Sequence, residues 1–326
     1  MNLSVRSIVQ PTVTLDDIER AAVRIAGRVR RTPMLRAGPV RTHGAVADGL
    51  WLKLENLQVT GSFKARGACN AVAALDPAAL ARGVVTASGG NHGLAVAYAA
   101  AAAGVTATVY VPRSVRMAKR ERLAVWGAVV VVVGEVWDDA YAAAAAHAAA
   151  GGQALLHPFA DPAVIAGQGT LALEALDDVP DIDTLLVAIG GGGLIAGVAV
   201  AARARRAGPR VVGVEPVGAA TLHDSLLAGR PVVLDGISTA AGTLAPRSTD
   251  ALNFGIVRDL VDHVVLVSDE AMRDAARWLW FEHGVGTELA GAASVAAVLT
   301  GAYRAATGEV VCAVVCGAGA DGFWVV

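Results

Sequence analysis

The segment Leu185-Leu186-Val187-Ala188-Ile189-Gly190-Gly191-Gly192-Gly193 decides the fold class of this chain. Its apolar first half predicts a buried strand, and the glycines lead into a helix predicted over Leu194–Ala207. Strands and helices alternate in the same way along most of the sequence. Such alternation indicates right-handed βαβ units, so we expect an α/β protein with open, twisted, mainly parallel sheets flanked by helices.

Fifteen further elements are predicted by the same reasoning. The predicted helices are Asp16–Ala26, Gly93–Ala103, Ala118–Trp126, Asp138–Ala150, Ala163–Ala175, Asp269–His283 and Gly291–Leu299, and a further helix begins near Ala219. The predicted strands are Leu50–Leu54, Val84–Ala87, Thr106–Val111, Val129–Val133, Val211–Val214, Val264–Val267 and Val310–Val315.

The four consecutive glycines, Gly190, Gly191, Gly192 and Gly193, follow a strand at its carboxyl end, where open α/β sheets bind ligands. Without side chains their N–H groups can approach an anion, which the helix N-terminus also attracts, so the pattern favours a phosphate cradle. One alternative is a tight turn in which glycines permit close packing. Another is a nicotinamide cofactor, because Gly191-x-Gly193-x-x-Ala196 followed by Glu215 satisfies the dinucleotide fingerprint.

A second strand-to-helix loop, Ser88-Gly89-Gly90-Asn91-His92, is rich in backbone donors. Such a loop suits a carboxylate, and the Asn91 amide suits an aromatic hydroxyl group. The alternative is an ordinary helix cap.

Lys64 lies in Gly61-Ser62-Phe63-Lys64-Ala65-Arg66-Gly67, at the start of a helix predicted over Lys64–Leu75. The partial positive charge of a helix N-terminus disfavours a second cation, which lowers the pKa of the amine. A partly neutral amine can attack a carbonyl and form a Schiff base. The alternative is a solvated surface lysine.

The composition limits the function classes. The chain has 326 residues, 55% of them hydrophobic, and a net charge of −2, which gives no support to nucleic-acid or membrane partners. Three cysteines, Cys69, Cys312 and Cys316, argue against a disulfide framework and indicate a reducing cytoplasm. Met1–Asp16 lacks the apolar core of a signal peptide, and the long uncharged runs are interrupted by glycines, unlike membrane spans.

In combination these motifs resemble the β-family of pyridoxal-phosphate (PLP) enzymes, also called fold type II or tryptophan synthase β-like. The resemblance is to the branch of threonine and serine dehydratases and serine racemase, and it runs from Thr32 to Asp321. Besides the glycine tetrad and the two loops, the motifs that carry it are Thr32-Pro33-Met34-Leu35, Lys53-Leu54-Glu55-Asn56, Pro162-Ala163-Val164-Ile165-Ala166-Gly167-Gln168-Gly169-Thr170 and Val214-Glu215-Pro216.

The resemblance implies a homodimer whose subunit has a large cofactor-binding domain, residues 1–73 and 163–326, and a small mobile domain, residues 74–162. It also implies the roles of the site residues. Lys64 forms the Schiff base with PLP and removes the α-proton, and Phe63 packs beside the ring. Asn91 binds the phenolic oxygen of the cofactor, and Cys316 contacts its pyridine nitrogen. The phosphate is held by Gly190, Gly191, Gly192, Gly193 and the Leu194 N–H, and the substrate carboxylate is bound by Ser88, Gly89, Gly90, Asn91 and His92.

The implied reaction is deamination of a β-hydroxy amino acid, threonine or serine, to a 2-oxo acid and ammonia. A racemase or a dehydratase of a bulkier hydroxy amino acid is the alternative. Racemases of the branch carry a serine where this chain has Gly89, which argues for elimination. Ala241 before Gly242, and Glu288-Leu289-Ala290-Gly291, depart from the usual pattern and indicate an unusual substrate.

A metal site in some relatives uses the positions of Glu215, the Ala219 carbonyl and Thr221. The last is an acidic residue in those relatives, so the pattern disfavours a bound Mg²⁺ or Ca²⁺ and leaves only Glu215 and the Ala219 carbonyl as metal ligands. The alternative for Glu215 is a charge at a helix N-terminus.

Overall fold

One half of the molecule is built around the larger of its two sheets. The computed structural model describes residues 13–43, 48–204 and 208–320. In this sheet only β1 runs antiparallel, against β2, and the remaining pairs are parallel. Its six strands lie in the order β1 (Met34–Arg36), β2 (Leu50–Lys53), β10 (Val311–Val314), β7 (Thr184–Ala188), β8 (Arg210–Pro216) and β9 (His263–Val267).

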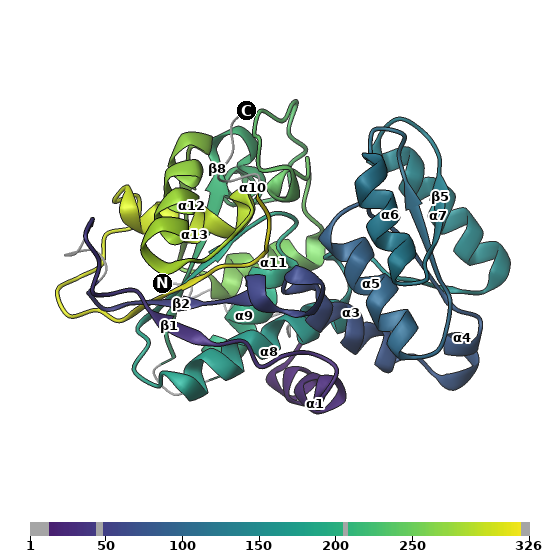
Figure 1. Ribbon diagram of the computed structural model, residues 1–326, viewed down its shortest axis with the longest axis horizontal. Coiled ribbons are helices and arrows are strands. Elements are labelled where there is room, and N and C mark those ends of the chain that lie inside the picture. The colour runs from purple at the N-terminus through teal and green to yellow at the C-terminus, as the bar shows by residue number, and fades with distance from the viewer. Residues whose placement is uncertain (1–12, 44–47, 205–207, 321–326) are drawn as a thin grey trace, which may run out of the picture.

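The smaller sheet is entirely parallel and forms the core of the other half, on the right in Figure 1. Its four strands lie in the order β5 (Val129–Val132), β4 (Ala107–Val111), β3 (Val84–Ala87) and β6 (Ala154–Leu155). Two mainly parallel sheets therefore confirm the predicted fold class. All four of these strands lie within the predicted small domain, whose limits and mobility stay predictions.

Helices flank both sheets (Figure 1). The α-helices are α1 (Leu15–Ile25), α3 (Lys64–Ala73), α4 (Pro77–Ala81), α5 (Asn91–Ala102), α6 (Met117–Val125), α7 (Trp137–Gly151), α8 (Pro162–Asp178), α9 (Gly193–Arg203), α10 (Thr221–Ala228), α11 (Ala251–Leu260), α12 (Asp269–His283) and α13 (Leu289–Leu299). Short 3-10 helices are η1 (Glu55–Leu57), η2 (Val59–Gly61), η3 (Val217–Ala219) and η4 (Gly242–Leu244).

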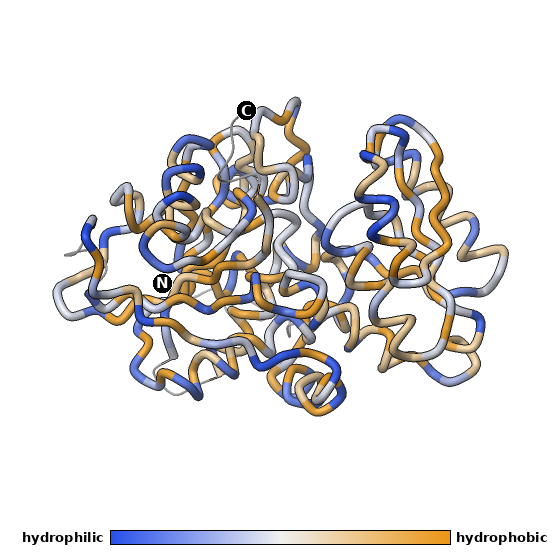
Figure 2. Tube along the Cα trace, in the orientation of Figure 1, coloured by the Kyte–Doolittle hydropathy of each residue, from blue (hydrophilic) through white to orange (hydrophobic). Residues whose placement is uncertain are grey.

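Local sequence explains where the helices begin. Thr14 and Asp17 form a reciprocal capping box at α1, and Asp161 accepts the N–H groups of Ala163 and Val164 at the start of α8. Hydrophilic and hydrophobic stretches alternate along α1, as Figure 2 shows, because one side of this helix is buried.

Helix α3 joins the two halves. Its buried residues Ala68, Cys69 and Val72 pack in one core cluster with Val84 and Val109 of the smaller sheet. The same helix begins at Lys64, beside the last strand of the larger sheet, because the Phe63 N–H donates to Cys316 O at 3.2 Å. Packing of α3 in the core of the smaller half, together with the bond from Phe63 to Cys316, therefore fixes the position of the lysine.

The predicted helices and strands are confirmed, and their ends agree within three residues with one exception. That exception is the carboxyl end of the helix predicted over Leu194–Ala207. The structure ends α9 at Arg203, and residues 205–207 lie outside the described residues, as do residues 1–12 of the N-terminal segment and Asp321. The sequence analysis missed β1, α4, β6 and α11. Among the described residues, no helix is long and apolar enough to cross a membrane.

Candidate active site

The glycine loop connects β7 to α9 at the carboxyl end of the sheet, and each glycine is tightly surrounded. A Cβ on Gly191 would collide with the Phe159 ring, and one on Gly193 would lie 2.7 Å from Phe159 O. Gly192 has φ +93°, a left-handed conformation that favours glycine. Close packing therefore accounts for part of the glycine requirement that the sequence analysis considered.

The N–H groups of this loop are nevertheless available. The first N–H groups of a helix have no acceptor within the helix, and α9 begins at Gly193. Among the described residues, none accepts a hydrogen bond from the N–H groups of residues 190–194. The loop therefore presents backbone donors at a helix N-terminus, the arrangement that binds anions.

The segment that follows β6 connects Lys64 to this loop, because it contacts both of them. The Lys64 Nζ donates to Pro158 O at 2.7 Å, and the next residue, Phe159, packs against Gly191. The Lys64 Nζ also lies 5.1 Å from the centre of the Phe63 ring. The structure thus brings together the lysine and the glycine loop, which are far apart in the sequence.

Burial lowers the pKa of the Lys64 amine to about 8, although Cys316 and the Glu288 carboxylate raise it. The Lys64 side chain as a whole is partly exposed, but its amine, at the inner end of the side chain, is buried. The direction matches the sequence analysis, but the largest cause is burial and not the helix N-terminus. A substantial fraction of this amine is neutral near pH 8 and can act as a nucleophile or base.

Cys316 lies at the end of β10 beside the lysine loop. Its Sγ donates to Ala290 O at 3.5 Å, and burial raises the pKa of the thiol well above its usual range. The thiol therefore remains protonated and neutral at physiological pH. A neutral thiol suits the predicted contact with an unprotonated ring nitrogen, which stays a prediction.

The loop from Ser88 to His92 ends in α5. Ser88 Oγ accepts the Gly90 N–H at 3.3 Å, as a cap does. The His92 ring is turned into the smaller half, where Nε2 donates to Leu156 O at 3.2 Å. Burial and the charge of Lys64 lower the pKa of His92 to about 3, so this ring is neutral. His92 can offer a carboxylate only its backbone N–H.

Glu288, at the start of α13, contacts the same loop from the larger half. Its Oε1 accepts from Asn91 Nδ2 at 2.8 Å and from Thr243 Oγ1 at 3.4 Å. A Cβ on Gly317 would collide with this carboxylate, so the glycine makes room for it. One N–H of the Asn91 amide is therefore engaged, and the other remains for the predicted bond to a phenolic oxygen.

Glu215 is fully buried, and its two carboxylate oxygens accept the N–H groups of Leu222 and His223, each at 2.8 Å. Burial raises the pKa of this carboxyl group to about 7. These contacts match the helix N-terminal role that the sequence analysis considered. Thr221 Oγ1 donates to Pro246 O, and within the described part of the chain no three His, Cys, Asp or Glu residues form a metal-binding group.

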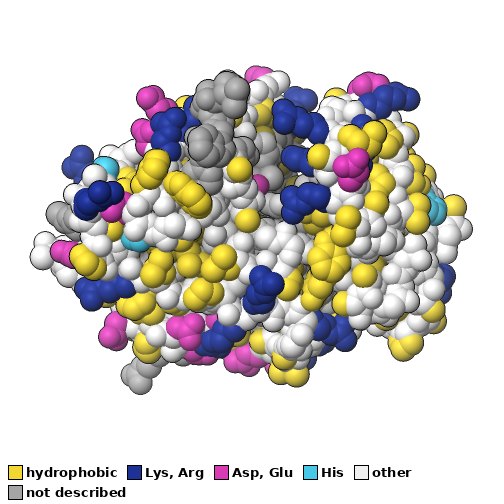
Figure 3. All heavy atoms as spheres, viewed as in Figure 1, with side chains coloured by type: hydrophobic (Ala, Val, Ile, Leu, Met, Phe, Trp, Pro, Cys, Tyr) yellow, Lys and Arg dark blue, Asp and Glu magenta, His cyan; other side chains and the backbone are white. Residues whose placement is uncertain are grey.

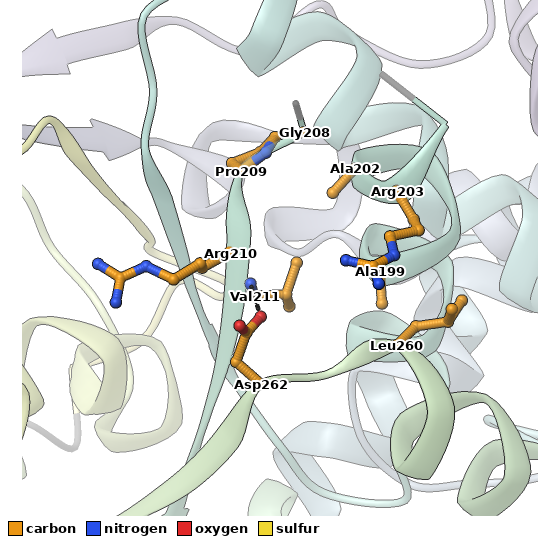
Figure 4. Close-up of a pocket in the computed structure, with 9 residues that line it drawn as sticks. All are labelled: Ala199, Ala202, Arg203, Gly208, Pro209, Arg210, Val211, Leu260 and Asp262. Atoms are coloured by element: carbon orange, nitrogen blue, oxygen red, sulfur yellow. Dashed lines mark hydrogen bonds between the residues drawn. The ribbon is translucent and has the colours of Figure 1, made fainter. Parts of the chain in front are cut away.

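A separate small pocket lies at the amino ends of the strands of the larger sheet, where β8 begins (Figure 4). Its volume is about 30 Å³, too small for an organic ligand. The Asp262 carboxylate beside it already accepts the Val211 N–H at 3.0 Å, as the dashed line shows. This pocket is therefore not the active site.

Comparisons with known proteins give one consistent result. The model of the family described as "Pyridoxal-phosphate dependent enzyme" matches residues 25–317. An L-threonine ammonia-lyase of Thermotoga maritima is 40% identical over 88% of this chain and 71% of its own length. A serine racemase of Oryza sativa subsp. japonica is 37% identical over 89% of this chain and 85% of its own length. The structure of maize serine racemase has a TM-score of 0.87 at 35% identity, covering 94% of this chain and 93% of that one.

The chain therefore belongs to the family of pyridoxal-phosphate dependent enzymes, which confirms the resemblance. Its cofactor is PLP, and its fold is fold type II. The residues present fit this cofactor. The glycine loop has no room for a Cβ at any of its four positions, its N–H groups suit a phosphate, and a partly neutral lysine lies nearby.

Three residues of the site were not identified from the sequence. Pro158 and Phe159 contact the lysine and the glycine loop, and Asn253 donates to Phe159 O and Gly191 O. The sequence analysis noted Glu288 only as part of a departure from the usual pattern, and its contact with Asn91 was not predicted. Ser-Thr-Asp at 248–250 is a typical helix start, because Asp250 accepts the Leu252 N–H. That signal could have revealed α11, which carries Asn253.

Proposed function

We propose that this protein is a PLP-dependent ammonia-lyase that converts threonine or serine to a 2-oxo acid and ammonia. The observation that supports it most is the position of Lys64, a buried amine with a pKa of about 8, held by Pro158 O beside the glycine loop. Threonine ammonia-lyase relatives at 40% and 41% identity support the same reaction.

The proposed roles of the residues follow from their chemistry. Bound PLP supplies an aldehyde for the lysine and a ring system that takes up the electron pair left on the α-carbon. The Gly190–Gly193 loop binds the phosphate, and the Ser88–His92 loop binds the substrate carboxylate through backbone N–H groups. The neutral amine of Lys64 accepts the α-proton. The neutral Cys316 thiol leaves the ring nitrogen without a charged partner.

Racemisation is the alternative for the same site, since serine racemases are among the relatives. It needs a proton donor on the face opposite Lys64. A Cβ on Gly89 would lie 2.6 Å and 2.8 Å from the two methyl carbons of Val115, so this position has no room for a side chain. That packing favours elimination.

The nicotinamide alternative has weaker support. Glu215 would have to bind a ribose hydroxyl, but this side chain is fully buried and both of its oxygens already accept α10 N–H groups. A dehydrogenase also gives no role to Lys64.

A coupled assay tests the proposal. The holoenzyme is given threonine, serine and bulkier β-hydroxy amino acids, and release of 2-oxo acid and formation of D-amino acid are both measured. We expect 2-oxo acid from threonine or serine, and none with Lys64→Ala. D-Amino acid as the main product, or NAD binding without a visible PLP band, would contradict the lyase assignment.

We further propose that the protein is a cytoplasmic homodimer acting on small molecules. The three described cysteines are buried and unpaired, as in reducing compartments. Phe281 and Trp280 of α12 are 71% and 48% exposed, and such apolar side chains favour association. Light scattering after gel filtration measures the mass, and a monomer at micromolar concentration would contradict the dimer.

A further inference from the structure

Asn253 of α11 lies between the Pro158–Phe159 segment and the glycine loop. Its side chain is completely buried, and Nδ2 donates to Phe159 O at 3.1 Å and to Gly191 O at 2.8 Å. Both neighbours are carbonyl oxygens, which only accept, and an amide nitrogen carries two N–H groups. One side chain therefore bridges the segment that follows β6 and the loop that follows β7.

On the glycine-loop side, the hydrogen bond from Asn253 to Gly191 O fixes the direction of the Gly192 N–H. Thr249 Oγ1 also donates to Gly191 O, at 3.1 Å, so this carbonyl is held toward α11 by two groups. In a planar trans peptide the C=O and the following N–H point in opposite directions. The Gly192 N–H is thereby directed away from α11, and it belongs to the set of N–H groups that suits a phosphate.

On the other side, the bond fixes the segment that holds the lysine. Pro158 O accepts from Lys64 Nζ at 2.7 Å, and the adjacent Phe159 O accepts from Asn253. The His157 ring completes this turn, because its Nδ1 accepts the N–H groups of Phe159 and Ala160 at 3.2 Å and 2.8 Å. Asn253 thus donates directly to the glycine loop and to the residue that follows the lysine acceptor.

We propose that Asn253 is a positioning residue that clamps the Pro158–Phe159 segment onto the glycine loop and so preorganises the phosphate-binding N–H groups. Without the clamp, two loops would have to become ordered when the phosphate binds, and this cost would weaken binding. The inference rests on the proposed assignment of Gly190–Gly193 to the phosphate.

The test compares PLP with pyridoxal, which lacks the phosphate. Dissociation constants for both are measured by absorbance titration of wild type, Asn253→Ala, and Asn253→Asp, which keeps the side-chain shape but removes both N–H donors. Loss of two hydrogen bonds that preorganise the loop predicts at least about a tenfold fall in the preference for PLP over pyridoxal. Pyridoxal affinity changes little.

Two control variants make the test specific. Asn70→Ala removes another buried amide, which donates to Ala163 O at 2.7 Å, and should leave the preference unchanged. Thr249→Val removes one bond to Gly191 O but keeps the bridge, and should cost less than Asn253→Ala. An equal loss in Thr249→Val would contradict the clamp.

The remaining outcomes separate the two proposals. If wild type prefers PLP and both Asn253 variants keep that preference, the clamp is wrong and the phosphate assignment stands. If wild type itself binds pyridoxal as tightly as PLP, the phosphate assignment is wrong. If Asn253→Ala and Asn253→Asp weaken PLP and pyridoxal equally, Asn253 has only a general structural role.

Discussion

At the scale of single residues, Lys64 is the clearest case of a side chain whose chemistry depends on its surroundings. Burial lowers the pKa of its amine, while Glu288 and Cys316 oppose the shift, with a result of about 8. A lysine in water has a pKa near 10.4 and is almost fully protonated at neutral pH. The site therefore raises the neutral fraction by more than a hundredfold, on the order expected for a shift of two to three units.

This pKa predicts how the reaction of the enzyme with its cofactor depends on pH. Only the neutral amine attacks the PLP aldehyde, so the rate of adduct formation by the apoenzyme should rise with pH and level off above a midpoint near 8. Stopped-flow absorbance between about pH 6 and pH 10 measures it. A midpoint near 10.4, the ordinary value for lysine, would show that burial does not act on this amine.

At the scale of elements, the turn from β7 into α9 shows why glycines are needed there. The Phe159 ring packs directly on Gly191, so Gly191→Ala forces the segment after β6 to move. Overpacking of this kind costs about 1–3 kcal/mol, and we expect PLP affinity to fall roughly ten- to a hundredfold. Absorbance titration with PLP measures the loss.

Gly255 provides the matched control in the neighbouring helix α11. A Cβ at this position meets nothing within 4 Å, so Gly255→Ala should keep PLP affinity and stabilise the protein by about 0.5–1 kcal/mol. If Gly191→Ala binds PLP as well as Gly255→Ala does, the packing of Phe159 on the loop has no role in binding.

Glu215 and α10 give an effect on stability at the same scale. Burial raises the pKa of this carboxyl group to about 7, so between pH 4.5 and 7 the folded state holds a proton that the unfolded state releases. The stability that Glu215 contributes by binding this proton is fully present below pH 4.5 and is lost as the pH rises through 7. The difference amounts to about 3 kcal/mol.

Urea denaturation of wild type and Glu215→Gln across this pH range measures the effect. Stability of wild type relative to the variant should decrease from pH 4.5 to 7. The burial of His92 and His157 lowers their pKa values and acts in the opposite direction, but it is common to both proteins and cancels in the difference. A constant difference would mean that Glu215 titrates normally.

At the scale of the whole molecule, the site lies between the two sheets. The glycine loop and Glu288 belong to the larger half, whereas the Ser88–His92 loop follows β3 of the smaller one. On the face in Figure 3, Lys and Arg side chains gather along the boundary between the halves, where they attract anionic ligands. A substrate bound through both loops must contact both halves at once.

This arrangement predicts closure. Small-angle scattering of the holoenzyme should show a smaller radius of gyration when serine or threonine is added, as residues 74–162 move toward the larger half. Because Lys64→Ala cannot complete the reaction, it serves to prolong the substrate complex. An unchanged radius in both proteins at saturating substrate would contradict a mobile small domain.

The sequence alone determined the α/β class, the positions of nearly all long elements and the motifs around Lys64, Asn91 and the glycine tetrad. These features are local, because a strand, a glycine turn and a helix start are each encoded within a few neighbouring residues. The elements it missed are β1, β6 and α4, which are short, and α11, whose start signal follows an irregular segment.

Only the tertiary structure decided which side chains meet. Lys64 and Pro158 are 94 residues apart, Gly191 and Asn253 are 62 apart, and Asn91 and Glu288 are 197 apart. No local pattern encodes such contacts, since they depend on how two sheets and their helices pack. The same holds for the pKa of Lys64, because its largest cause is burial, a property of the folded chain and not of the residues beside it.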